Sequence, residues 1–178
     1  FEATVKIEEL NKKKSEKDGS TKTSSGKIIP PPKEKELKKP NINPNIKNFS
    51  NWSKKAPKTM SWYDAKKYCE NLVENGYSDW RLPIIYELRK LIQNCPVTEA
   101  GGACKIGSSC LSESCWSKAC DGCSAASAGI YSKLGDLGWF WSWSELSNST
   151  DQAWVVNFFN GDVSDFNKNF EHNVRCVR

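Results

Sequence analysis

Residues 138–178 read GWFWSWSELSNSTDQAWVVNFFNGDVSDFNKNFEHNVRCVR and carry the clearest strand signals of the chain. Within this stretch, residues 153–159 (AWVVNFF) are rich in β-branched and aromatic residues, which favour strands. Asn160-Gly161 follows, a dipeptide that tolerates positive φ and predicts a two-residue hairpin turn. The chain resumes at 162–166 and, after a second turn, ends with 170–178. The pattern predicts three antiparallel strands in this last third of the chain.

Four tryptophans lie in this stretch, at positions 139, 141, 143 and 154. Residues 139, 141 and 143 alternate, so on one strand their side chains would share a face. We expect Trp141 and Trp154 to lie in the core. Trp143 is expected to be exposed, where it could stack on a sugar or anchor a protein contact.

The solvent side of the predicted hairpin carries Phe, Asn, Asp, Ser and His, where a purely structural surface would favour Lys, Glu and Thr. Exposed aromatic rings beside short polar side chains suit recognition. The alternative is ordinary turn chemistry, in which Asn and Asp are common. These residue types are also reachable from an Asn codon by changing its two adenines, which is typical of positions diversified by adenine-directed mutagenic retroelements. The predicted recognition face consists of Trp143, Phe159, Asn160, Asp162, Asp165, Phe166, Asn167, Asn169, Phe170 and His172.

The basic excess of the chain lies in its first part. Residues 1–50 hold twelve Lys against seven Asp and Glu, whereas residues 51–178 hold fourteen charges of each sign and all Trp and Cys. This division predicts a basic, Pro- and Lys-rich tail or linker over 1–50, with a marginal helix at 3–14, and one folded domain over 51–178. The tail could contact an anionic polysaccharide, although interleaved acidic residues favour a plain solvated linker. The neutral domain gives no reason to expect a nucleic-acid partner.

Two helices are expected at the start of the domain. Residues 61–64 (SWYD) are typical of a capping box, and Gly76 is a plausible stop for the helix that follows. A second helix should begin after Pro83. Their apolar stripes are Trp62, Ala65, Cys69 and Leu72 in the first helix, and Ile85, Leu88, Leu91 and Ile92 in the second.

The cysteine usage indicates an oxidising compartment. Eight cysteines and a single histidine favour disulfides over a metal site. In the Cys-rich insertion, residues 95–123, disulfides would substitute for hydrophobic burial. The rival interpretations of the C-x-x-C at 120–123 are a zinc site and a redox pair. No apolar run is long enough to span a bilayer, so an anchor or signal peptide would have to lie upstream of Phe1.

Several motifs resemble those of one known family. They are YCENL at 68–72, GYSDWRLP at 76–83, EL at 87–88, WS at 141–142, SE at 144–145, AW at 153–154, GDV at 161–163, Lys168 and VRCVR at 174–178. Over residues 51–178 the chain resembles the Lcl C-terminal domain family, which is named from a Legionella collagen-like adhesin. This family overlaps the Fibrobacter succinogenes major paralogous domain.

The resemblance implies a C-type-lectin-like α+β fold, of the branch related to formylglycine-generating enzymes. Two helices would surround a small twisted antiparallel sheet, and the two ends of the domain would lie side by side. Because such folds bring the first helix and the last strand together, we expect a disulfide between Cys69 and Cys176. The family's usual residues are a capping Thr at the place of Ile84 and a Ser at the place of Trp143. The other cysteines are expected in further disulfides whose pairing the sequence leaves open: Cys95, Cys104, Cys110, Cys115, Cys120 and Cys123.

The resemblance implies an exported bacterial protein at the cell surface, and its adhesin member binds sulfated polysaccharide. We therefore expect a non-catalytic extracellular recognition or adhesion module for a glycan or protein ligand. One alternative is a structural subunit or cap of a surface assembly. Another is an enzyme of the formylglycine-generating type, which the lone His172 does not favour. We expect no cofactor, although calcium is a candidate through Asn148, Asp151, Asp162 and Asp165.

Overall fold

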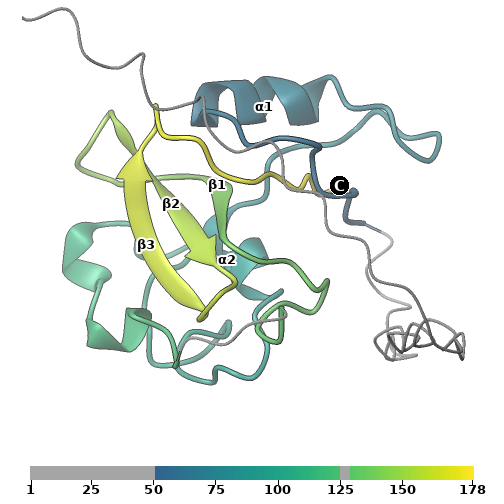
Figure 1. Ribbon diagram of the computed structural model, residues 1–178. Coiled ribbons are helices and arrows are strands. Elements are labelled where there is room, and N and C mark those ends of the chain that lie inside the picture. The colour runs from purple at the N-terminus through teal and green to yellow at the C-terminus, as the bar shows by residue number, and fades with distance from the viewer. Residues whose placement is uncertain (1–50, 125–128) are drawn as a thin grey trace, which may run out of the picture. The chain divides into compact units, whose positions relative to one another are not determined.

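The computed structural model describes residues 51–124 and 129–178, and these residues form an α+β domain (Figure 1). The architecture of two helices beside a small antiparallel sheet is the predicted one. The predicted tail over 1–50 and its helix at 3–14 lie outside the described residues. None of the described helices is long and apolar enough to cross a membrane. The elements are α1 (Trp62–Glu70), α2 (Ile85–Arg89), the 3₁₀ helices η2 (Glu113–Cys115) and η3 (Lys118–Cys120), and strands β1 (Trp139–Glu145), β2 (Gln152–Asn157) and β3 (Asp162–Asn167).

The three strands form one antiparallel sheet in the order β1-β2-β3. The prediction of three strands is correct in number within the described residues, but the third strand is β1 and not residues 170–178. That last segment forms isolated bridges, in which His172 pairs with Met60 and Val177 pairs with both Trp52 and Arg81. Because its partners change along its length, no continuous ladder forms.

The β2–β3 connection is longer than predicted. Asn157 pairs with Asp162, so the loop holds the four residues 158–161. A two-residue type I′ turn needs positive φ at both central residues. Here Gly161 has φ +78°, whereas the Asn160 side chain accepts a hydrogen bond from the Asp162 amide at 3.2 Å. The loop therefore closes through Gly161 alone, whose amide donates to the Asn157 carbonyl at 2.8 Å.

Hydrophobic cores cover both faces of the sheet. Trp141 and Val155 pack on the side of α1, and Trp154 and Val156 pack on the side of α2 and the Cys-rich insertion. Trp141 and Trp154 are completely buried, as predicted. Both buried indoles have their N–H group hydrogen-bonded: Trp141 Nε1 donates to the Met60 carbonyl at 2.9 Å, and Trp154 Nε1 donates to the Leu111 carbonyl at 3.0 Å.

Helix α1 begins where predicted and ends earlier. The Ser61 hydroxyl accepts a hydrogen bond from the Asp64 amide at 3.2 Å, which caps the first turn. The predicted stop at Gly76 is wrong, because Asn71 already ends the helix and donates to the Lys67 carbonyl at 2.7 Å. Gly76 instead has φ +81° in the tight turn that follows.

Helix α2 is only five residues long. Leu91 and Ile92 of the predicted apolar stripe lie beyond its end and are buried there. Its N-cap residue, Ile84, offers no side-chain acceptor. The hydroxyl of Ser144, on β1, accepts a hydrogen bond from the Ile85 amide at 3.0 Å instead. A residue distant in sequence thus supplies the cap that a Thr at position 84 would have given.

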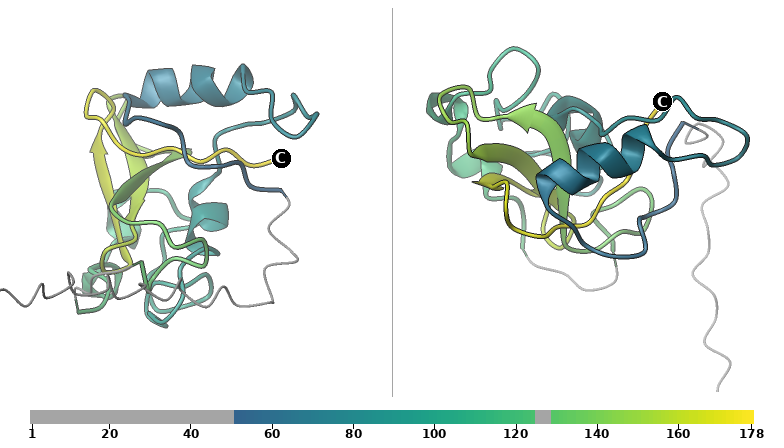
Figure 2. Two further views of the ribbon diagram at one scale, coloured as in Figure 1. Left: turned by 45° about the vertical axis from the view of Figure 1, so that its right-hand side comes forward. Right: turned by 90° about the horizontal axis from the view of Figure 1, so that it is seen from above.

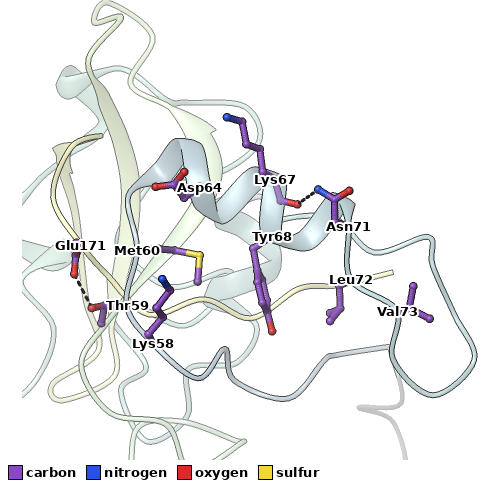
Figure 3. A pocket seen from close by; sticks show the side chains of 10 residues that line it. All are labelled: Lys58, Thr59, Met60, Asp64, Lys67, Tyr68, Asn71, Leu72, Val73 and Glu171. Carbon is purple, nitrogen blue, oxygen red and sulfur yellow. Dashed lines mark hydrogen bonds between the residues drawn. The ribbon is translucent and has the colours of Figure 1, made fainter.

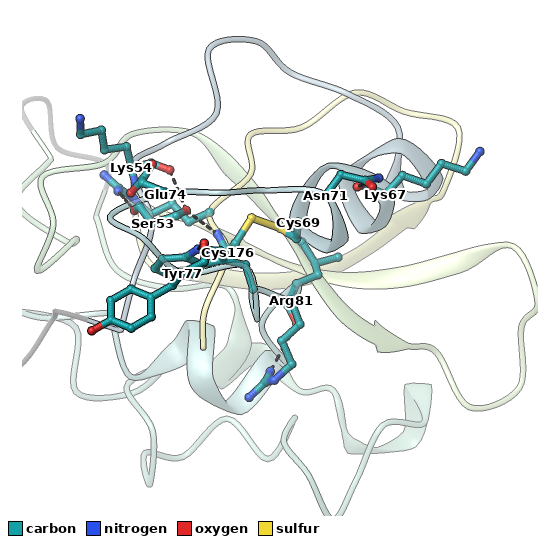
Figure 4. The surroundings of a disulfide bond; sticks show 12 residues. Ser53, Lys54, Lys67, Cys69, Asn71, Glu74, Tyr77, Arg81 and Cys176 are labelled. Atoms are coloured by element: carbon teal, nitrogen blue, oxygen red, sulfur yellow. Dashed lines mark hydrogen bonds between the residues drawn. A yellow bond between two sulfur atoms is a disulfide. The ribbon is translucent and has the colours of Figure 1, made fainter.

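The beginning and the end of the domain lie side by side beneath α1 (Figure 2). The Ser53 amide donates to the Cys176 carbonyl at 2.9 Å, and the Arg178 amide to the Asn51 carbonyl at 3.0 Å. The predicted Cys69–Cys176 disulfide is present, with its Cα atoms 5.5 Å apart (Figure 4). This bridge ties α1 to the last segment of the chain.

The Cys-rich insertion is held by three further disulfides, Cys95–Cys123, Cys104–Cys120 and Cys110–Cys115. Cys120 and Cys123 bond to different partners, so the C-x-x-C is neither a redox pair nor a zinc half-site.

Arg89 organises the same insertion from α2, a role that no pattern in the sequence indicates. Its buried guanidinium donates to the carbonyls of Thr98 and Glu99, both at 2.8 Å, and to those of Cys104 and Ile106. Burial lowers the pKa of Arg89.

Candidate functional site

A row of aromatic side chains lies exposed on the α1 side of the sheet, beyond the area that α1 covers. The ring centroids of Trp139 and Phe166 are 4.9 Å apart, and those of Phe166 and Phe170 are 5.9 Å apart. Phe170 is 57% exposed, whereas Trp139 and Phe166 are half-buried. Helix α1 packs on β1, so it leaves this part of β3 open.

Polar side chains border the rings on the same side of the sheet. Trp139 is opposite Asn157, and Asn157 is opposite Asp162, so these three residues form one cross-strand row. Ser164, two residues along β3, points to the same side. All of them are partly exposed. We call this surface the aromatic face; it consists of Trp139, Asn157, Asp162, Ser164, Phe166 and Phe170.

The polar groups of the aromatic face have unused hydrogen-bonding capacity. Among the described residues, neither the Asp162 carboxylate nor the Ser164 hydroxyl has a hydrogen-bond partner. The side-chain oxygen of Asn157, Oδ1, accepts a hydrogen bond from the Phe159 backbone amide at 3.0 Å. Its side-chain nitrogen, Nδ2, is left unpaired within the same residues. A carboxylate, a hydroxyl and an amide can together accept and donate several hydrogen bonds to a ligand.

His172 lies beneath this face and not on it. The predicted exposure is wrong, because the residue is 8% exposed and packed among rings. Its ring centroid is 4.5 Å from that of Trp141 and 4.9 Å from that of Phe166. Burial lowers the pKa of His172 to about 4, so the imidazole is neutral at neutral pH. Its Nε2 is buried without a hydrogen-bond partner in the described part of the chain.

The rest of the predicted recognition face is divided among other surfaces. Asp165 lies opposite Trp154, on the insertion side of the sheet, and accepts a hydrogen bond from Gln152 Nε2 at 2.6 Å. Burial, and secondarily the charge of Glu113, raises the pKa of Asp165. Asn167 alternates with Phe166 and therefore also points to the insertion side. Asn169 is exposed in the loop after β3.

The β2–β3 turn is in contact with the Cys-rich insertion. Asn160 Nδ2 donates to the Asp121 carbonyl at 3.2 Å, and the Cys123 amide donates to the Asn160 carbonyl at 2.7 Å. Asn160 therefore supports the loop, while Phe159 beside it stays 44% exposed. The same approach affects Asp162: burial, and secondarily the charge of Asp121, raises its pKa to about 6.

Trp143 is exposed, as predicted, but lies away from the aromatic face. Alternation along β1 places Trp143 on the α1 side with Trp141, and its ring centroid lies 6.4 Å from that of Trp62 on α1. Lys66 Nζ lies 3.9 Å from the Trp143 ring centroid and 4.5 Å from that of Trp62. The ammonium group between two indoles explains the position of Trp143 without a ligand.

A wide groove of about 540 Å³ lies beside α1 (Figure 3). Tyr68 and Leu72 form part of its lining, with Lys58 and Glu171 at its border. The Glu171 carboxylate already accepts a hydrogen bond from the Thr59 hydroxyl at 3.0 Å. The Asn71 amide nitrogen in its lining is likewise engaged, with the Lys67 carbonyl at 2.7 Å.

The proposed calcium ligands do not converge. Asp162 and Asp165 point to opposite sides of β3, and Asn148 and Asp151 belong to the β1–β2 loop. Residues 51–124 and 129–178 contain no group of three or more His, Cys, Asp or Glu side chains that could hold a metal ion.

Of the predicted recognition residues, Asp162, Phe166 and Phe170 lie on the aromatic face, which also holds Asn157 and Ser164, two residues that the prediction did not include. Alternation along β2 and β3 is the signal that finds them, once the register of the two strands is known. Trp139 was recognised as aromatic but not assigned, because its partner on the sheet was unknown.

The chain matches a known protein-family model. The family model described as the Lcl C-terminal domain matches residues 46–178, which include every element of the fold and the whole aromatic face. No curated protein matches the chain.

Proposed function

The chain belongs to the Lcl C-terminal domain family, and from its aromatic face we propose that it is a non-catalytic recognition module at the bacterial cell exterior. The observation that carries the proposal is the pairing of exposed rings with unpaired polar groups on one side of the sheet. Clusters of partly exposed aromatic residues are typical of binding surfaces. A structural surface of β3 would have no need of them.

Two further observations support this proposal. The four disulfides are typical of proteins in oxidising compartments, and they fit an exported domain. His172 is neutral and enclosed by rings, and all eight cysteines are in disulfides, so the residues that most often act as bases or nucleophiles are occupied in the fold. The resemblance to C-type-lectin-like domains points in the same direction.

The proposal is tested by binding of the full chain to arrays of immobilised glycans and extracellular proteins. Phe170→Ser removes the most exposed ring of the aromatic face, and Tyr63→Ser is the matched control on α1, where the ring is 47% exposed. We expect Phe170→Ser to lose a ligand that the wild type and Tyr63→Ser retain, with an unchanged near-UV circular dichroism spectrum. If every array ligand is bound equally by all three proteins, the aromatic face is not the recognition surface.

A further inference from the structure

We propose that the aromatic face takes an uncharged glycan chain, in preference to a sulfated or uronic-acid polysaccharide. This inference rests on the proposed function, since it names the ligand class of the same surface. It is carried by the stacking surface, by the unpaired polar groups and by the sign of the charges around them.

The rings offer a surface that suits one side of a sugar. Phe166 meets Trp139 at 63° and Phe170 at 80°, so neighbouring rings pack edge to face in one partly exposed cluster. The negative face of an aromatic ring attracts polarised C–H groups. A pyranose carries such C–H groups on its flat sides, and Phe170 is the ring with most surface still in contact with water.

The border of the face suits hydroxyl groups. A sugar hydroxyl both donates and accepts, and the face supplies an acceptor-only carboxylate at Asp162, a donor amide at Asn157 and a hydroxyl at Ser164. These groups are unpaired in the part of the chain that the structure describes. A ligand that presents hydroxyls beside C–H surface satisfies them, whereas an apolar protein side chain would leave them buried and unpaired.

The charges argue against an anionic chain. The aromatic face contains no Lys or Arg, and its single ionisable group is the Asp162 carboxylate, with Asp121 close enough to perturb it. Two cations on the α1 side have partners of their own: Lys168 Nζ lies 2.6 Å from Glu145 Oε2, and Lys66 Nζ lies over the rings of Trp62 and Trp143. A sulfate or carboxylate placed on this face would meet the Asp162 carboxylate and no positive charge among the residues of the face.

The test is titration of the full chain with two sets of oligosaccharides. The neutral set is cellohexaose, xylohexaose, laminarihexaose and chitohexaose, and the anionic set is hexasaccharides of heparin and chondroitin sulfate. We expect at least one neutral oligosaccharide to bind, and its affinity to fall at least tenfold in Phe170→Ser and in Asp162→Ala. Tyr63→Ser should stay within twofold of the wild type. Any heparin binding should be the same in the wild type and both face variants, because it would use the basic tail.

Each other outcome is decisive. Failure of all neutral oligosaccharides to bind, or binding of an anionic one that is lost in Phe170→Ser, overturns the neutral-glycan inference. Binding of an anionic oligosaccharide that is lost in Phe170→Ser would still leave the aromatic face as the recognition surface. A protein ligand from the arrays that depends on Phe170, without neutral glycan binding, would likewise overturn the neutral-glycan inference and leave the aromatic face as the recognition surface. Neutral binding that is indifferent to both face variants would instead overturn the aromatic face itself. Near-UV circular dichroism of both variants establishes that the packing around Trp139 is kept.

Discussion

Removing the disulfide between Cys69 and Cys176 should destabilise the domain far more than removing the one between Cys110 and Cys115. The first bridge closes a sequence separation of 107 residues and joins α1 to the last segment. The second closes a separation of 5 residues within the insertion. The two Cys→Ala double variants are therefore a matched pair in chemistry that differ mainly in loop length.

The chain-entropy relation gives the magnitude of each effect. It predicts about 4.8 kcal/mol for the long loop and about 2 kcal/mol for the short one at 25 °C. The difference of roughly 3 kcal/mol is more reliable than either value, because both variants lose the same two sulfur atoms from partly or fully buried sites. The long bridge also positions Cys176, whose amide donates to the Ser53 hydroxyl at 2.8 Å.

Urea unfolding followed by tryptophan fluorescence measures both free energies of unfolding. We expect the Cys69→Ala/Cys176→Ala variant to show the lower midpoint, with partial unfolding at 37 °C. The reasoning is wrong if the Cys110→Ala/Cys115→Ala variant is equally or more destabilised. That result would mean that the insertion, and not the closure of the chain ends, limits the stability of the domain.

Further predictions concern single residues and the tail. The pKa of Asp162 is raised in the fold, so ionisation of this carboxyl destabilises the domain. This destabilisation is absent below about pH 4 and grows as the pH rises through about 6. Asp162→Asn should remove this pH dependence from thermal melts and raise the free energy of unfolding by roughly 1 kcal/mol at pH 7.5, after allowance for the partial exposure of the residue. Arg89→Met should cost about 3 kcal/mol or more in urea unfolding, because several buried carbonyls lose their donor. Ser144→Ala should cost about 1 kcal/mol in the same assay, since α2 loses its only hydroxyl cap. Deletion of residues 1–50 should abolish salt-sensitive retention on a heparin column, and equal retention by the truncated chain would reveal a basic patch on the domain.

The features that local chemistry determines could be predicted from the sequence. Ser61 caps α1 because a hydroxyl three residues before a free amide is enough. Trp141 and Trp154 are buried because a small domain has few other side chains of that size for its core. The Cys69–Cys176 bridge, in contrast, followed from the family resemblance and not from the residues themselves.

The features that depend on distant partners could not be predicted. Residues 170–178 are rich enough in apolar side chains to form a strand, but their hydrogen bonds go to three separate segments. Alternation along a strand already separates Asp162 from Asp165, but only the pairing of β3 with β2 shows which of the two shares a side with Asn157. Arg89 is an ordinary helical residue by pattern, and only the folded insertion gives it buried carbonyls to bind.

The central claim is that ligand binds at the aromatic face, and indole NMR tests it most directly. Five tryptophans have an indole N–H bound to a backbone carbonyl in the structure: Trp62, Trp80, Trp116, Trp141 and Trp154. Trp139 has no such bond within the described residues and lies on the aromatic face. On titration of the full chain with a bound neutral hexasaccharide, the Trp139 indole resonance, assigned with Trp139→Phe, should shift while these five and Trp143 stay in place. A shift of Trp143 or Trp116 with Trp139 unchanged would place the ligand elsewhere and contradict the account.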